Sequence, residues 1–242
     1  KIIFETDPRL VPLFERSFPE IKWLGKSDPP SKEALSKSID FQCPSGSLGR
    51  FLRSSESKFS GGAPYLKAEV IACNKIRRRY KKKDEKLVGV AWKSKSPQSG
   101  EDKSMRLSQL KPLFQIEGIR FIDLQYGETR DERMAFVDEL GVELLHDDSI
   151  DQLSSLDDFS AQVASLDLVI SVSNTTVHMA GALGIPVWVM LRSVPDRRWM
   201  LNRDDSPWYS SVRLFRQKKM GDWAHVIEKV VVELKKFADN FN

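Results

Sequence analysis

One junction between a strand and a helix constrains the fold of this chain more than any other feature. Residues 168–172 read Leu-Val-Ile-Ser-Val, and a polar run follows without a break, Ser173-Asn174-Thr175-Thr176. Almost unbroken apolar strands are typical of parallel sheets covered on both faces. Ser, Asn and Thr favour helix N-caps, and Gly184 ends the helix expected over residues 175–183. The segment therefore predicts a buried parallel strand that leads directly into a helix.

Strands and helices alternate along most of the chain. Short apolar runs predict strands over residues 87–92, 119–125, 142–145, 168–172, 187–191 and 212–215. Helical periodicity falls between them, around Leu107 to Phe114 and over residues 129–140, 159–166, 175–183 and 222–237. This alternation predicts an α/β protein with a Rossmann-type, doubly wound parallel sheet. Such sheets bind ligands at the carboxyl ends of their strands.

The first third of the chain shows a smaller α/β pattern. Strands are expected over residues 2–5 and 21–24, a short buried strand over 39–42, a turn over 44–49 and a polar loop over 54–62. Asp7 and Pro8 are a suitable N-cap and first residue for a helix after the first strand. We expect a partial N-terminal domain over residues 1–66, a basic linker helix over 67–85 and the main domain over 86–242.

Composition excludes several classes of protein. No apolar run approaches the ~20 residues that span a bilayer, and no signal-peptide pattern opens the chain, so we expect a cytoplasmic protein. Two cysteines, Cys43 and Cys73, are too few for a disulfide scaffold or a cysteine-rich zinc site. The three histidines, His146, His178 and His225, are too scattered for a paired metal site. We expect neither a metal nor a cofactor.

A basic run surrounds Tyr80, with arginines at 77–79 and lysines at 81–83. Such a run can bind nucleic acid or an anionic membrane. More often it is the solvated end of a helix, and the rest of the chain is close to neutral. A nucleic-acid partner is therefore not expected, although it stays an alternative.

Polar residues follow three other predicted strands. Trp92, Lys93 and later Lys103 follow the strand over residues 87–92, and Gln125 and Tyr126 end the strand over 119–125. An aromatic and basic stretch over residues 197–209 follows a later strand. Each has an ordinary explanation, as a solvated loop, a turn or a cover of the core edge. Because the carboxyl ends of parallel strands converge, we instead expect them to share one site.

The polar run at 173–176 suits phosphate. A helix N-terminus presents unpaired N–H groups and a partial positive charge, and His178 lies one turn further on. The alternative is that these residues simply cap the helix. The chain lacks Gly-x-Gly-x-x-Gly, Walker-A and Gly-x-Ser-x-Gly motifs, which argues against dehydrogenases, P-loop enzymes and serine hydrolases.

Residues 167–186 resemble the donor-site segment of heptosyltransferase-like (family 9) glycosyltransferases, in the variety found C-terminal to tetratricopeptide repeats in bacterial proteins. Weaker matches follow the same order along the chain: Asp7-Pro8-Arg9-Leu10 and residues 89–92, 124–127 and 206–217. The resemblance implies a GT-B architecture and a metal-independent, inverting transfer of sugar from a nucleotide-diphosphate donor to an unknown glycan or protein acceptor.

The resemblance also implies a set of donor-binding residues. Asn174, Thr175 and Thr176 would meet the diphosphate, with His178 beside them, and Lys103 would pair with phosphate. Gln125 and Tyr126 would hold the ribose and base, with Glu128 as the nearest acidic residue. The expected donor set is completed by Trp92, Lys93 and Ser173, where Ser173 replaces the usual Asp.

The front of the chain departs from the family pattern. The family begins with a strand and a Gly-rich loop that carries the presumed catalytic base, whereas residues 1–66 resemble only the back part of an acceptor domain. The chain is then a fragment or a reduced relative, and the sequence identifies no catalytic base. The alternative function is a non-catalytic nucleotide-binding or protein-interaction module derived from such an enzyme.

Overall fold

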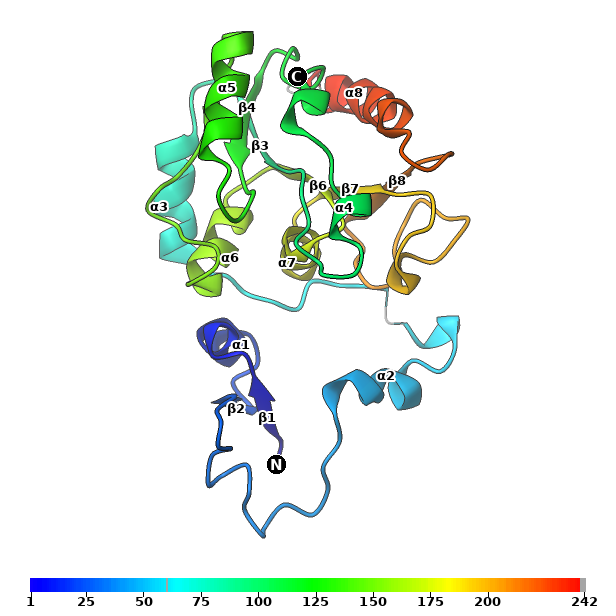
Figure 1. Cartoon of the computed structure of the whole chain (residues 1–242). Helices are drawn as coiled ribbons and strands as arrows, with labels where there is room; N and C mark the ends of the chain where they lie inside the picture. The colour runs from blue at the N-terminus through cyan, green and yellow to red at the C-terminus, as the bar shows by residue number, and fades with distance from the viewer. Residues whose placement is uncertain (60, 240–242) are drawn as a thin grey trace.

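A parallel sheet forms the main body of the computed structural model, which describes residues 1–59 and 61–239 (Figure 1). Its six strands are β3 (Lys86–Ala91), β4 (Ile119–Asp123), β5 (Leu144–Leu145), β6 (Leu168–Val172), β7 (Val187–Leu191) and β8 (Val212–Arg216). Their order is β5-β4-β3-β6-β7-β8, and every neighbouring pair is parallel. The expected doubly wound sheet is confirmed. Its direction of winding reverses between β3 and β6, where such folds bind ligands.

Helices cover both faces of this sheet. On one face, α3 (Val70–Tyr80), α6 (Leu156–Ala164) and α7 (Thr175–Leu183) share a core with alternate strand residues such as Leu87 and Val169. On the other face, α5 (Arg130–Leu140), α8 (Trp223–Asp239) and the 3-10 helix η3 (Leu107–Leu110) pack against residues such as Val88 and Leu168. Burial on both faces explains the continuous apolar strands.

A smaller unit precedes the main sheet and lies beneath it in Figure 1. Strands β1 (Ile3–Thr6) and β2 (Lys22–Gly25) pair in parallel, connected through η1 (Pro8–Leu10) and α1 (Val11–Ser17). Phe4, Phe14 and Phe18 surround the buried Trp23 ring. The Asp7 carboxylate accepts the Arg9 N–H at 3.0 Å, so the expected N-cap is confirmed, although the first turn is 3-10 rather than α.

Two expectations for residues 39–49 are wrong. The predicted strand over residues 39–42 is irregular, and Phe41 is 94% exposed, because none of the strands in the described part of the chain pairs with it. The predicted turn over 44–49 is mostly helical, since α2 (Ser45–Leu52) begins after Pro44. The polar loop that follows contains one 3-10 turn, η2 (Glu56–Lys58). In Figure 1, α2 lies on a long arm away from the main sheet.

The main domain follows its predicted elements more closely. The strand Leu168–Val172 and the helix Thr175–Leu183 match residue for residue, and Gly184 ends the helix at φ +78°. The helix expected around Leu107 to Phe114 is only the short η3 followed by a turn. The short α4 (Gly100–Lys103) was not expected. None of the helices described here is both long and apolar enough to cross a bilayer.

Candidate functional site at the switch point

A cavity of about 420 Å³ opens where β3 and β6 end. This volume lies within the usual ~300–1,000 Å³ of small-molecule sites. The wall is formed by loop residues 94–96, the start of α7, the segment before α6, and the loop between β7 and η4 (Arg197–Trp199). Arg9 of the N-terminal unit closes one side, and its Nη1 donates to the carbonyl of Leu153 at 2.7 Å. Both units of the chain therefore contribute to the cavity.

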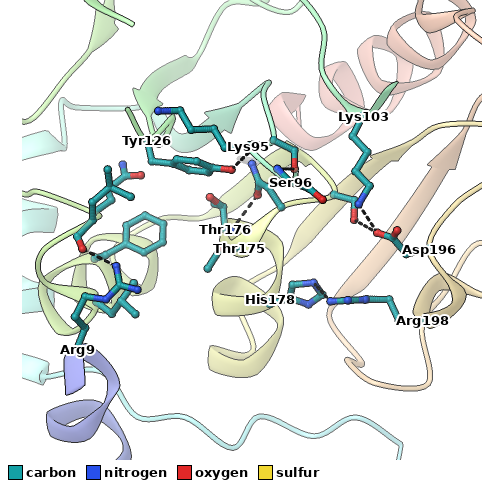
Figure 2. A pocket seen from close by; sticks show the side chains of 17 residues that line it. Arg9, Lys95, Ser96, Lys103, Tyr126, Thr175, Thr176, His178, Asp196 and Arg198 are labelled. Carbon is teal, nitrogen blue, oxygen red and sulfur yellow. Dashed lines mark hydrogen bonds and ion pairs between the residues drawn. The ribbon is translucent and has the colours of Figure 1, made fainter. Parts of the chain in front are cut away.

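The two ends of the cavity differ in chemistry (Figure 2). At one end lie the aromatic ring of Tyr126 and the apolar Leu153, with the cations Arg9 and Lys95 beside them, and the apolar lining residues Leu156 and Phe159 follow Leu153 along the chain. The other end is polar and lined by Lys103, Ser173, His178, Asp196 and Arg198. The first turn of α7 lies between them. An elongated ligand with an aromatic part at one end and polar groups at the other suits this arrangement.

Asn174 positions the first turn of α7. Its side-chain Oδ1 accepts the N–H of Thr176 at 3.0 Å and the hydroxyl of Ser171 at 3.2 Å. Its Nδ2 donates to the carbonyl of Lys93 at 3.1 Å. Asn174 thus caps α7, which was the ordinary interpretation of this residue, and its Nδ2 also joins the helix to the end of β3. Thr175 is exposed, and the N–H groups of the first turn that Asn174 does not bind can donate hydrogen bonds to an anion.

Lys103 lies in an ion pair within the cavity wall. Only 8% of the residue is exposed, and its Nζ lies 2.8 Å from Oδ2 of Asp196. The hydroxyl of Ser173 also donates to Asp196, at 3.3 Å, while accepting Nε1–H of Trp199 at 2.8 Å. Burial alone would raise the pKa of Asp196, but the hydrogen bond and charge of Lys103 lower it below its usual value. Asp196 is therefore ionised at neutral pH.

His178 is a neutral side chain that holds Arg198. Its ring stacks on Trp199, with centroids 5.4 Å apart and planes at 7°. Burial and the nearby Arg198 lower its pKa to about 4. Because a guanidinium can only donate, the Nε2 of His178 accepts from Arg198 Nη1 at 2.8 Å. Nδ1 then carries the proton and donates to the hydroxyl of Tyr209 at 3.1 Å.

The cavity carries a positive excess. Four cationic side chains line it, those of Arg9, Lys95, Lys103 and Arg198, against the single carboxylate of Asp196 among its described lining residues. The dipole of α7 adds partial positive charge at the same place. Clefts lined by charge of one sign concentrate ligands of the opposite charge. The arrangement favours an anionic ligand.

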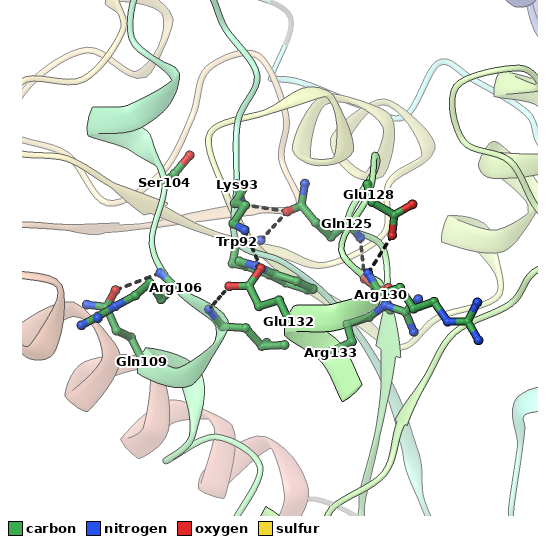
Figure 3. Close-up of polar contacts among 12 residues, drawn as sticks. Trp92, Lys93, Ser104, Arg106, Gln109, Gln125, Glu128, Arg130, Glu132 and Arg133 are labelled. Carbon is green, nitrogen blue, oxygen red and sulfur yellow. Dashed lines mark hydrogen bonds and ion pairs between the residues drawn. The ribbon is translucent and has the colours of Figure 1, made fainter. Parts of the chain in front are cut away.

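Seven of the ten predicted donor residues line the cavity. They are Lys103, Tyr126, Ser173, Asn174, Thr175, Thr176 and His178. The other three, Trp92, Lys93 and Gln125, do not line the cavity and contact one another instead (Figure 3). Gln125 Oε1 accepts the N–H groups of Trp92 and Lys93 at 2.8 and 2.7 Å. It therefore fixes the end of β3 instead of facing a ligand.

Glu132 binds the side chains of the two residues that follow β3. The buried Trp92 donates its Nε1–H to Glu132 at 3.1 Å, and Lys93 forms an ion pair with the same carboxylate. Glu128, the acidic residue considered near the ribose, accepts the N–H of Arg130 at 3.1 Å and does not line the cavity. These contacts support the wall from behind.

Several lining residues escaped the sequence analysis as site residues. Arg198 lies in the aromatic and basic stretch, Lys95 lies in the lysine-containing loop after the strand over residues 87–92, and Arg9 lies in a segment noted for the family resemblance. Asp196 could not be predicted as a site residue, because a single acidic residue in a loop does not indicate a function. The apolar lining residues before and within α6 could not be predicted either, since the pattern around Leu153 and Phe159 is that of ordinary helix or core residues.

Several side chains of the basic run at the end of α3 make contacts within the chain. Arg77 donates to the Ser165 carbonyl and to Asp167, both at 2.6 Å. Arg79 pairs with Asp147, and Lys82 pairs with Glu143 at 2.8 Å. These contacts favour the helix-end interpretation over nucleic-acid binding.

Comparisons with known proteins give limited similarity. No family model matches the chain. Protein FlbA of Caulobacter vibrioides is 29% identical over 245 residues, which cover 95% of this chain and 40% of FlbA. The chain thus spans less than half the length of that relative.

Two solved structures are also similar to this chain. The family 9 glycosyl transferase of Veillonella parvula DSM 2008 has a TM-score of 0.49 at 13% identity, over 72% of this chain and 53% of that one. The ADP-heptose LPS heptosyltransferase II of E. coli has a TM-score of 0.49 at 11% identity, over 71% and 54%.

Proposed function

We propose that this chain binds a nucleotide-diphosphate sugar and transfers its sugar to an acceptor, without a metal and with inversion. The observation that carries the proposal is the cationic cavity at the switch point, where the N-terminus of α7 lies between Lys103 and Tyr126. A diphosphate fits above the α7 N-terminus, because N–H groups and the helix dipole favour negative charge there. The resemblance of residues 167–186 to a sugar-donor segment supports the same assignment.

The two ends of the cavity fit the two ends of such a donor. The rings of Tyr126 and Phe159 suit a nucleobase, which binds through its flat apolar face. The polar end, with Asp196 and Arg198, offers acceptors and donors for sugar hydroxyls. On transfer, the diphosphate leaves with additional negative charge. The α7 N-terminus and Lys103 would stabilise that charge as it develops, which is electrostatic catalysis by preorganised groups.

One observation keeps the non-catalytic alternative in view. Among the described residues that line the cavity, the single carboxylate is that of Asp196, and it is paired with Lys103. An inverting transfer needs a base to take the proton of the acceptor hydroxyl. If this chain has lost transfer, it serves as a nucleotide-binding module. Release of free or transferred sugar from a bound donor by the purified chain would exclude that alternative.

Calorimetric titration tests the binding step directly. The purified chain is titrated with UDP, ADP and GDP and with their sugar conjugates, and saturable binding of one nucleotide series is expected. Thr175→Glu places a carboxylate in the cavity at a helix N-terminus, where acidic residues stabilise helices. This variant should fold and lose binding, whereas the neutral control Thr175→Gln should keep it. Failure of all three series to bind the wild-type chain would contradict the proposal.

A further inference from the structure

Asp196 pairs with Lys103 and has a second carboxylate oxygen that can contact a ligand. Its Oδ2 receives both protein contacts, from Lys103 Nζ at 2.8 Å and from the Ser173 hydroxyl at 3.3 Å. Oδ1 makes no hydrogen bond or ion pair with any residue that the structure describes. The side chain is 24% exposed and lines the polar end of the cavity. One carboxylate oxygen is therefore held and the other is available.

A second ion pair lies beside that of Asp196, outside the cavity lining. Arg192 Nη1 lies 2.9 Å from Asp102, and the adjacent Lys103 pairs with Asp196. Two pairs thus join the loop after β7 to the short α4. The Asp196 carboxylate itself is held by Lys103 and Ser173 before any ligand enters. A preorganised acceptor of this kind discriminates between ligands better than a mobile one.

An ionised carboxylate accepts hydrogen bonds and donates none, so it favours hydroxyl groups and repels phosphate oxygens. Lys103 is paired with Asp196, so its charge attracts a terminal phosphate less than that of an unpaired lysine would. A free terminal phosphate carries about −1.5 to −2 charges at pH 7, with a second pKa near ~6. Esterification by a sugar removes that second charge. Compared with a neutral side chain at this position, a carboxylate disfavours a free terminal phosphate more than a sugar-linked one.

We propose that Asp196 is a specificity-determining residue that accepts a hydrogen bond from a sugar hydroxyl and disfavours a terminal phosphate dianion. The site then selects the intact sugar donor over the free nucleoside diphosphate that remains after transfer. This inference rests on the proposed function, because it assumes that the diphosphate lies over α7 and the sugar beside Asp196.

The test compares three ligands that share one nucleoside. They are the nucleoside diphosphate, its methyl ester and its sugar conjugate, each titrated into the wild-type chain and into Asp196→Asn. The methyl ester separates charge from hydroxyl contacts, since it has the lower charge but no sugar. Asp102→Asn is the matched control, because Asp102 belongs to the neighbouring ion pair and does not line the cavity.

In the wild-type chain, the methyl ester should bind about tenfold more tightly than the free diphosphate, as expected for relief of one close charge repulsion. Asp196→Asn should remove that difference and weaken binding of the sugar conjugate. Asp102→Asn should leave the order of the three ligands unchanged. The wild-type comparison tests the charge effect even if the Asn variant fails to fold.

Equal changes in the affinity of all three ligands in Asp196→Asn would overturn the inference, since Asp196 would then act only as a counter-ion of Lys103. Equal binding of the free diphosphate and its methyl ester by the wild-type chain would also overturn it. In both cases the proposed function survives, because nucleotides still bind. If the wild-type chain binds none of the nucleosides in any of the three forms, the proposed function fails and this inference fails with it.

Discussion

The side-chain amide of Asn174 donates to the main-chain carbonyl of Lys93 at 3.1 Å. This contact joins the start of α7 to the end of β3, across the point where the sheet reverses its winding. The same side chain caps α7 through the N–H of Thr176. Asn174 therefore links the helix that follows β6 to the end of the neighbouring strand β3.

Asn174→Ala should lower the free energy of unfolding by about 1–3 kcal/mol, since it removes an N-cap and two further hydrogen bonds. Urea denaturation measures this loss. The exposed neighbour Thr175→Ala is the control and should change stability by less than about 0.5 kcal/mol. An unchanged stability of Asn174→Ala, together with lost nucleotide binding, would mean that Asn174 contacts the ligand itself.

Lys103→Ala should weaken binding of a nucleoside diphosphate by about 1.5–3 kcal/mol, or roughly 10- to 150-fold. The variant loses the cation and leaves Asp196 unpaired in the cavity. Lys93→Ala is a matched control, because Lys93 pairs with Glu132 behind the wall. This variant should bind the nucleoside diphosphate nearly as tightly as the wild type does. Calorimetry on both variants decides the matter. Equal losses in the two would remove Lys103 from the site.

His178 should make stability depend on pH. Its pKa is about 4 in the folded chain, below the ~6.5 of an unfolded histidine, because burial disfavours the charged ring. As pH falls below ~6.5, the unfolded chain takes up a proton that the folded chain refuses. The contribution of neutral His178 to stability is therefore complete above pH ~6.5 and is lost toward pH 4.

The variant His178→Gln isolates this effect. The wild-type chain should lose about 2–3 kcal/mol more than the variant between pH 7 and pH 4. Denaturant unfolding across that range measures the difference between the two proteins, in which the other titrating groups cancel. Parallel pH profiles would show that the ring of His178 is protonated without cost.

Gly89→Ala should destabilise the sheet core by about 1–3 kcal/mol through overpacking. An added Cβ would lie 2.4 Å from Leu124 Cδ1 and 2.6 Å from Leu166 Cδ1. Gly46→Ala is the opposite case, since nothing lies within 4 Å of an added Cβ in the exposed α2. That change should leave stability unchanged or raise it by up to about 1 kcal/mol. Thermal unfolding of both variants provides the comparison.

The elements that could be predicted are those whose sequence and surroundings agree. Residues 168–172 are apolar because helices cover both faces of β6, and the Gly184 conformation follows from its lack of a side chain. The prediction for residues 39–49 was wrong because it used only the local sequence pattern and not the neighbouring elements. An apolar residue such as Phe41 forms a strand only where a partner strand exists, and here it is exposed.

The same distinction separates the site residues that could be predicted from those that could not. Thr175 and Lys103 could be predicted because they follow buried strands, and strand ends converge in a parallel sheet. Gln125 follows a strand too, but its amide turns back to hold the main chain of Trp92. Rotamer choice of this kind depends on neighbours that are distant in sequence. Asp196 and Leu153 are brought to the cavity only by packing between elements.

The strand order also determines how recognition is divided along the chain. Apart from Arg9 and the loop residues 94–96, the aromatic end of the cavity comes from residues 126–159, and apart from Lys103 the polar end comes from residues 173–198. These two stretches belong to opposite halves of the sheet, which meet where β3 pairs with β6. Selectivity for the two halves of a ligand is thus encoded in separate, consecutive blocks of sequence. Each block can diverge among relatives while the other is retained.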